Sequence, residues 1–191
     1  MVKTEPPATR AAPPPAPAAP LAGGGESTAP TPPLTIPTIL VVGDDGGFAQ
    51  IFRVQDGIEA KLSSTASNDV DPRSAAGRIV FSTDRDGNVE VYIADTSMTV
   101  SRRVTSSGAH DDRPALNPSG STIIFVSNRG GAPRLWTVPA PALDATTFDT
   151  PVALETGSAT ATPEGAPAWS PDGSTIAFSS TRTGRSEIFT V

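Results

Sequence analysis

Three segments of this chain repeat one pattern of residues. They cover 71–92, 113–136 and 166–189, and each runs from a proline-containing stretch through a short apolar run to Phe, then Arg, then a second aromatic residue. Equivalent residues of the three copies lie 44 and then 53 residues apart. The sets with this spacing are Phe81, Phe125 and Phe178; Arg85, Arg129 and Arg182; and Tyr92, Trp136 and Phe189. All variation in length therefore falls outside the repeated core. A period of roughly 40–50 residues built from short strands predicts a propeller-like array.

Each copy alternates apolar or β-branched runs with turn residues. The runs at 123–126 and 175–178 have the length and composition of strands. Pro-Asp-Gly at 171–173 and Pro-Ser-Gly at 118–120 are typical of tight turns. A second turn and a third strand follow, and we expect a fourth strand at 102–105 and at 152–155. Four antiparallel strands joined by short hairpins form one propeller blade, so the predicted fold class is all-β.

The last copy also carries a recognisable set of motifs. It reads Trp-Ser-Pro-Asp-Gly at 169–173, Ile-Ala-Phe-Ser-Ser at 176–180 and Arg-Thr-Gly at 182–184. These motifs resemble the WD40-like PD40 repeat of TolB-type β-propellers. The resemblance covers roughly residues 39–191. The first full copy departs from it, with Ser-Ala-Ala-Gly at 74–77 in place of the turn, and a still earlier copy at 39–52 lacks the signature Arg and Phe. We therefore expect this end to be less regular.

The number of expected strands does not complete a ring. About three strands fall in 38–64, two full blades in 69–156 and three strands in 167–191, which makes about 3.5 blades in repeats at about 38–66, 67–108, 109–157 and 164–191. Closed propellers have about four to eight blades. We expect an open or incomplete ring, either because the sequence is a fragment of a longer propeller or because self-association completes a ring of about seven blades.

Composition separates a tail from the blades and excludes several kinds of partner. Residues 1–37 hold 11 of the 21 prolines, which predicts a flexible Pro/Ala-rich tail before a propeller segment at 38–191. The formal net charge of −6 argues against nucleic acid and anionic membrane surfaces as partners. The chain has no cysteine, so disulfides and thiolate metal sites are excluded. We find no signal peptide and no apolar stretch long enough for a transmembrane helix.

An acid stands three positions before the proline of each copy: Asp69, Asp111 and Glu164. Because these acids precede the predicted innermost strand, we expect them on channel-mouth loops together with Asp71, His110 and Asp112. In a functional interpretation they form an acidic mouth that binds a cation or a basic partner segment. In a structural interpretation each carboxylate accepts backbone N–H groups or pairs with a repeat arginine, as a fastener from blade to blade. Repetition at fixed spacing favours the structural interpretation.

The remaining repeat positions are expected to be structural, and no catalytic residue is predicted. Trp136 and Trp169 stand at repeat positions and are expected, like the repeat Phe and Arg residues, to pack between blades. His110 is the only histidine, and no Gly-x-Ser-x-Gly nucleophile motif accompanies it. No calcium-loop spacing is present, so the sequence indicates neither a metal site nor a cofactor.

The resemblance implies a function that the repeats alone do not. TolB-type propellers are non-catalytic scaffolds in bacterial envelope complexes, and they bind partners through loops at the channel mouth. We therefore expect a protein or peptide partner and a periplasmic or otherwise exported location. One alternative is the substrate-gating propeller portion of a longer serine peptidase-like protein. Another is a propeller that binds a small ligand, a sugar or a cation.

Overall fold

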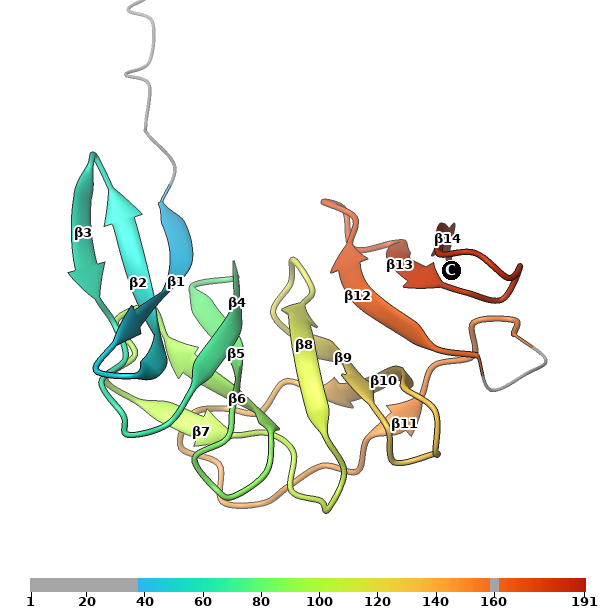
Figure 1. The fold of residues 1–191 in the computed structure, drawn as a ribbon, viewed down its shortest axis with the longest axis horizontal. Helices are drawn as coiled ribbons and strands as arrows, with labels where there is room; N and C mark the ends of the chain where they lie inside the picture. Colours follow the sequence, from blue (N-terminus) through green and yellow to red (C-terminus); the bar gives the residue numbers. More distant parts are fainter. Residues whose placement is uncertain (1–37, 159–161) are drawn as a thin grey trace, which may run out of the picture. The chain divides into compact units, whose positions relative to one another are not determined.

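The computed structural model describes residues 38–158 and 162–191, which belong to one unit, Ile36–Val191. Within these residues the regular elements are all strands, and they form four separate antiparallel sheets of three, four, four and three strands (Figure 1). The prediction of an all-β propeller with about 3.5 blades in an incomplete ring is confirmed. The predicted tail at 1–37 lies outside the described residues. No helix in the described part is long and apolar enough to cross a membrane.

In every sheet, strands that are neighbours in sequence are also neighbours in space. The first sheet contains β1 (Ile39–Asp45), β2 (Phe48–Gln55) and β3 (Ile58–Lys61). The second contains β4 (Asp69–Ala75), β5 (Arg78–Thr83), β6 (Glu90–Asp95) and β7 (Ser101–Arg103). The third contains β8 (Asp111–Leu116), β9 (Thr122–Ser127), β10 (Arg134–Pro139) and β11 (Val152–Ala153). The fourth contains β12 (Glu164–Trp169), β13 (Ile176–Ser180) and β14 (Glu187–Thr190).

Strand register shows which strand each three-stranded sheet lacks. In the second sheet Phe81 of β5 pairs with Tyr92 of β6, and in the first sheet Val41 of β1 pairs with Phe52 of β2. Because Phe52 is the equivalent of Tyr92, β1 is the equivalent of β5, a second strand. The first sheet therefore contains strands two to four of a blade, whereas the fourth sheet contains strands one to three.

The core lies between the sheets, in three apolar clusters. The cluster between the first two sheets joins Ile51 to Phe81, the next joins Val91 to Phe125, and the last joins Leu135 to Phe178. The three phenylalanines are at most 1% exposed, and each faces the preceding blade. The next strand of each blade also carries a residue that points the other way. Val91 of β6 is one of these, and it faces the following blade. Both faces of a blade are thus apolar, which is why a single blade has no independent core.

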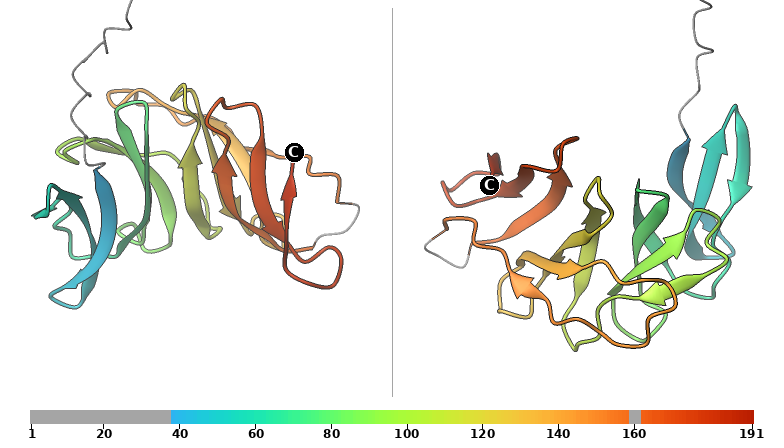
Figure 2. Two further views of the ribbon diagram at one scale, coloured as in Figure 1. Left: turned by 90° about the horizontal axis from the view of Figure 1, so that it is seen from above. Right: turned by 180° about the vertical axis from the view of Figure 1, so that it is seen from behind.

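The long connection between β10 and β11, residues 140–151, forms a strap over the second sheet. Arg78 donates to the carbonyl of Pro141 (3.2 Å), and Arg102 donates to the carbonyl of Thr147. The Arg102 guanidinium also lies 5.7 Å from the ring centre of Phe148. Figure 2 shows this segment running back from the third sheet toward β7. The third repeat is therefore longer than the second because it contains this connection, which holds the second and third sheets together.

Candidate functional site

The first strands of the three later sheets line the inside of the arc. β8 contacts both β4 and β12, and Figure 1 shows the three strands along the inner edge. Each has a bulge, and at each bulge a residue other than glycine has a positive φ: Asp71 (52°), Arg113 (49°) and Ala166 (49°). A bulge re-aims side chains, and such backbone strain recurs at functional sites. All three residues line one small hollow of about 60 Å³. This inner face is the candidate functional site.

The repeat acids do not belong to the exposed part of this face. Each is the first residue of its innermost strand, not a residue of the preceding loop, and its side chain is fully buried. Each is paired with the arginine of its own repeat, in the order Asp69 with Arg85 at 2.9 Å, Asp111 with Arg129 at 2.6 Å and Glu164 with Arg182 at 3.1 Å. A buried and neutralised carboxylate cannot form the acidic mouth that the functional interpretation requires.

The pairing of each acid with a repeat arginine, which the structural interpretation predicts, is present, but the ion pair itself does not cross between blades. Both partners of each pair lie in one sheet, because the arginine stands in the second turn of the same repeat. The link to the preceding blade is made by a hydroxyl group instead. Thr65 donates to Asp69 (2.9 Å), Ser107 to Asp111 (3.5 Å), and Thr156 to Glu164. Each carboxylate therefore joins a turn of its own blade to the end of the blade before.

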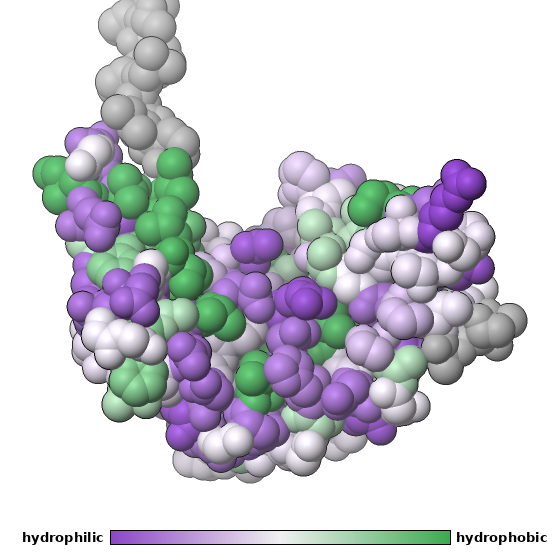
Figure 3. Space-filling view, viewed as in Figure 1, coloured by the Kyte–Doolittle hydropathy of each residue, from purple (hydrophilic) through white to green (hydrophobic). Residues whose placement is uncertain are grey.

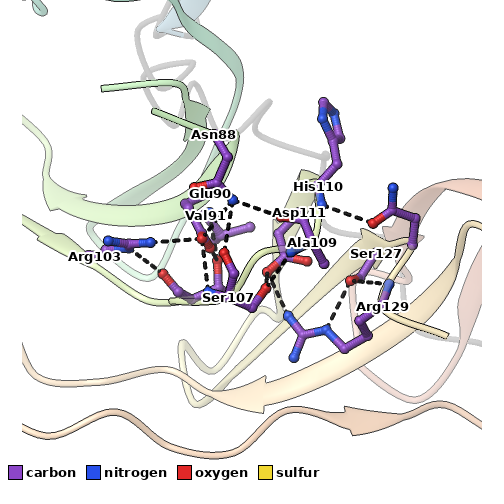
Figure 4. A network of polar contacts seen from close by, with 12 residues as sticks. Asn88, Glu90, Val91, Arg103, Ser107, Ala109, His110, Asp111, Ser127 and Arg129 are labelled. Atoms are coloured by element: carbon purple, nitrogen blue, oxygen red, sulfur yellow. Dashed lines mark hydrogen bonds and ion pairs between the residues drawn. The ribbon is translucent and has the colours of Figure 1, made fainter. Parts of the chain in front are cut away.

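The repeat arginines form the same contacts in every copy. Arg129 lies over the rings of Phe125 and Trp136, with its guanidinium carbon 5.4 and 5.0 Å from the ring centres. It also donates from its backbone N and its Nε to the hydroxyl of Ser127 (Figure 4). The equivalent contacts of the other two arginines involve Arg85 with Phe81, Tyr92 and Thr83, and Arg182 with Phe178, Phe189 and Ser180. Since the pattern recurs three times, it belongs to the architecture of the blade.

The structure also shows a buried acid that sequence reasoning missed. Glu90 is fully buried and accepts hydrogen bonds from four residues (Figure 4): Asn88 (3.0 Å), Arg103 (2.7 Å), Thr105 (2.5 Å) and the backbone N of Ser107 (2.9 Å). Burial by itself would raise the pKa of Glu90, but these bonds together lower it. Gln50 occupies the same position in the first sheet and is 1% exposed. The sequence does contain a signal for this position: in both sheets a long polar residue stands two positions before the aromatic residue of the third strand.

His110 and Asp112 lie beside the inner face and form a contact of their own. The His110 Nε2 is 3.3 Å from the Asp112 Oδ2, which is also 3.9 Å from the Arg113 Nε. Burial raises the pKa of Asp112, although Arg113 and His110 act in the opposite direction. Across residues 38–158 and 162–191 no three His, Asp or Glu side chains are grouped so as to hold a metal ion.

A larger hollow of about 490 Å³ on the inner face shares Arg73 and Pro167 with the small hollow at the bulges. Its walls are mostly small or apolar side chains from all three innermost strands and the turns that follow, including Ala75, Leu116, Pro118 and Trp169. Trp169 also packs on the core between the last two sheets and donates from its Nε1 to the carbonyl of Ala115 (3.2 Å). Trp136 packs on the core between the second and third sheets. The two tryptophans thus have different surroundings, and Trp169 borders the hollow.

Solved structures share this architecture, although no protein-family model matches the chain. TolB from Acinetobacter baumannii aligns with 74% of this chain and 34% of its own, at 17% identity and a TM-score of 0.59. The chain therefore has a TolB-like β-propeller fold. A puromycin-hydrolyzing peptidase from Mycobacterium tuberculosis aligns with 80% of this chain and 27% of its own, at 12% identity and a TM-score of 0.55. The chain spans about a third of the TolB structure and about a quarter of the peptidase.

Proposed function

We propose that this chain is a non-catalytic propeller scaffold that binds a protein or peptide on the inner face formed by β4, β8 and β12. One observation supports this most directly. The acids and arginines of the repeats are paired with each other inside the blades. The inner face instead presents an apolar hollow of about 490 Å³ beside charged groups at the bulges. A concave apolar surface with a few polar groups is the usual form of a recognition site.

The proposal divides the predicted site residues into two groups. Asp71, Asp112 and His110 stand at or beside the inner face and are proposed to contact a partner. Asp69, Asp111 and Glu164 are buried and are proposed to support the face from behind. The likeness in fold to TolB supports a role in a bacterial envelope complex and a periplasmic or otherwise exported location.

The inner face can be tested by filling its hollow. Ala168 is exposed and lines the hollow, so Ala168→Arg should obstruct it. Peptides selected from a displayed library on the immobilised chain are expected to bind Ala168→Arg at least about ten times more weakly. Val152→Arg is the matched control, since Val152 is 63% exposed on the outer strand β11. Selected peptides that bind both variants as well as the unmodified chain would contradict the proposal.

The fold shared with a peptidase supports a second candidate function. A propeller that stands before a hydrolase domain can gate access to it, and the same inner face would then contact substrate peptides in transit. The discriminating measurement is whether a hydrolase domain joined to the chain cleaves the selected peptides. Peptides that bind but are not cleaved favour the scaffold.

We also propose that a second copy of the chain covers the open faces of the end sheets. Ile39 is 52% exposed, whereas its equivalents Ile79 and Ile123 are 2% and 0% exposed. Figure 3 shows hydrophobic residues gathered over β1. On the fourth sheet Ile188 is 72% exposed, although the residues at its position in the other three sheets are fully buried. At each internal junction these two kinds of face pack on each other, so a head-to-tail contact would bury both.

Sedimentation of charged variants tests this contact. Ile39→Asp and Ile188→Asp should each be monomeric, and an equimolar mixture should recover a pair through its one intact contact. Ile58→Asp is the control, because Ile58 is 71% exposed but pairs with Gln55 and so lies on the other face of the first sheet. A chain that is monomeric at every concentration would refute self-association, and a mixture that stays monomeric would refute the head-to-tail arrangement.

A further inference from the structure

Two arginines of the inner face differ from every repeat arginine. Among the described residues, the Arg73 guanidinium donates to a single group, the carbonyl of Pro72 (3.0 Å). Arg113 has its Nε 3.9 Å from Asp112, while its two terminal nitrogens donate to no group in the part of the chain that the structure describes. Both arginines are exposed. Most of their donor groups are therefore unused within the described residues, in contrast to those of Arg85, Arg129 and Arg182.

The fold brings these two arginines to one place. Arg73 comes from β4 and Arg113 from β8, and both line the small hollow at the bulges. From β12, Ala166 and Pro167 line the same hollow. The residue before them is Gly165, where a Cβ would lie 3.4 Å from the Arg113 Nη1. The absence of a side chain there leaves the guanidinium open toward β12. Arg73 also borders the larger apolar hollow. Two arginine side chains with unused donors therefore stand at one end of that hollow, beside the carboxylates of Asp71 and Asp112.

Asp71 makes the site selective among anions. It lines the same small hollow as the two arginines and forms no ion pair within the described residues. A carboxylate beside the arginines would repel a doubly charged group such as a phosphate, while it could accept a hydrogen bond from a neutral N–H. The last residue of a peptide offers both groups together: a singly charged carboxylate, which matches the fork of an arginine, and an amide N–H next to it.

We infer that the inner face binds the free carboxyl terminus of a peptide whose last side chains are apolar. The carboxylate is placed at Arg73 and Arg113, the terminal N–H at Asp71, and the apolar side chains in the larger hollow. This inference rests on the proposed peptide-binding function and specifies its ligand. It also differs from the basic partner considered from the sequence, because Asp69, Asp111 and Glu164 are paired inside the blades.

The test uses two peptide libraries that differ in one group. N-acetylated apolar hexapeptides of mixed sequence are prepared with a free carboxyl terminus and with a terminal amide. Binding to the full chain is followed by calorimetry and by the fluorescence of Trp169, which borders the hollow. The carboxylate library should bind about 10–100 times more tightly, which is the range for charge-assisted hydrogen bonds of about 1.5–3 kcal/mol. Added salt should weaken that library more than the amide library.

Arginine variants then locate the carboxylate. Arg113→Gln and Arg73→Gln should each remove most of the difference between the two libraries while leaving the amide library unchanged. Arg185→Gln is the matched control, because Arg185 is exposed in the second turn of the fourth sheet and should have no effect.

The outcomes separate this inference from the function on which it rests. If both libraries bind equally, lose affinity in Ala168→Arg and ignore the arginine variants, the carboxylate site is overturned while peptide binding stands. If neither library binds and no displayed peptide is selected, the proposed function itself fails. A carboxylate preference that persists in Arg73→Gln and Arg113→Gln would overturn the assignment to these residues.

Discussion

Replacing Arg129 with leucine should destabilise the fold by about 3–5 kcal/mol. The Arg129 Nη2 lies 2.6 Å from the Oδ2 of Asp111, whose side chain is fully buried. Leucine retains aliphatic packing but leaves that buried charge without its cation, and breaking a buried ion pair from one side costs about 3–5 kcal/mol. The loss of the guanidinium from the rings of Phe125 and Trp136 adds about 1 kcal/mol.

The loss of stability caused by Arg129→Leu should depend on pH, because it depends on whether Asp111 is ionised. Burial raises the pKa of Asp111 even though Arg129 lowers it, so loss of Arg129 should raise that pKa further. A carboxyl group with a higher pKa in the folded state destabilises the fold when it ionises. That penalty is complete above the folded pKa and absent below the unfolded value of about 3.9. The difference between Arg129→Leu and the unmodified chain should therefore shrink as the pH falls from neutral to about 4.

Urea unfolding followed by tryptophan fluorescence measures both effects. Arg185→Leu is the control, since this exposed arginine should change stability by less than about 0.5 kcal/mol. Adding Asp111→Asn to Arg129→Leu should recover much of the lost stability, because the uncompensated charge is then gone. A loss below about 1 kcal/mol, or a double variant no more stable than Arg129→Leu, would refute the role assigned to the buried charge.

Three further predictions concern packing, backbone conformation and pH. Phe125→Ala should lower the free energy of unfolding by about 3–5 kcal/mol, because Phe125 is fully buried between two blades; a loss under about 1 kcal/mol would contradict that. Gly120→Ala should lower the melting temperature more than Gly184→Ala: both glycines have positive φ, but a Cβ at Gly120 would lie 2.6 Å from a side-chain carbon, whereas Gly184 has open space. Asp172 has its pKa lowered to about 2, first of all by a hydrogen bond from Ser170, so it stabilises the fold above about pH 4 and this contribution is lost as the pH falls toward 2. Acid titration of Asp172→Asn should lack that loss, and an unchanged profile would contradict the prediction.

The sequence by itself determined the class of fold and most of its local structure. The pattern at 171–180, a Pro-Asp-Gly turn followed by a β-branched and aromatic run, forms a hairpin leading into β13. Such elements depend on residues close together in the chain, through backbone preferences and side-chain alternation. The count of about 3.5 blades followed from the same signals. The fourth strands were found but extended too far, because β7 and β11 end at Arg103 and Ala153.

Tertiary structure alone decided which charges are buried and which are free. Repetition in the sequence favoured a pair between Asp111 and a repeat arginine, which Arg129 supplies, but nothing in the sequence showed that Arg113, two residues later, opens onto the inner face. Glu90 was missed for the same reason, since its partners come from a segment that only packing brings near. The partners of a buried charge come from other strands and turns of its own blade and from the end of the blade before, and only folding brings them together. Repeats in a sequence specify one blade well, but they do not specify what two adjacent blades enclose between them.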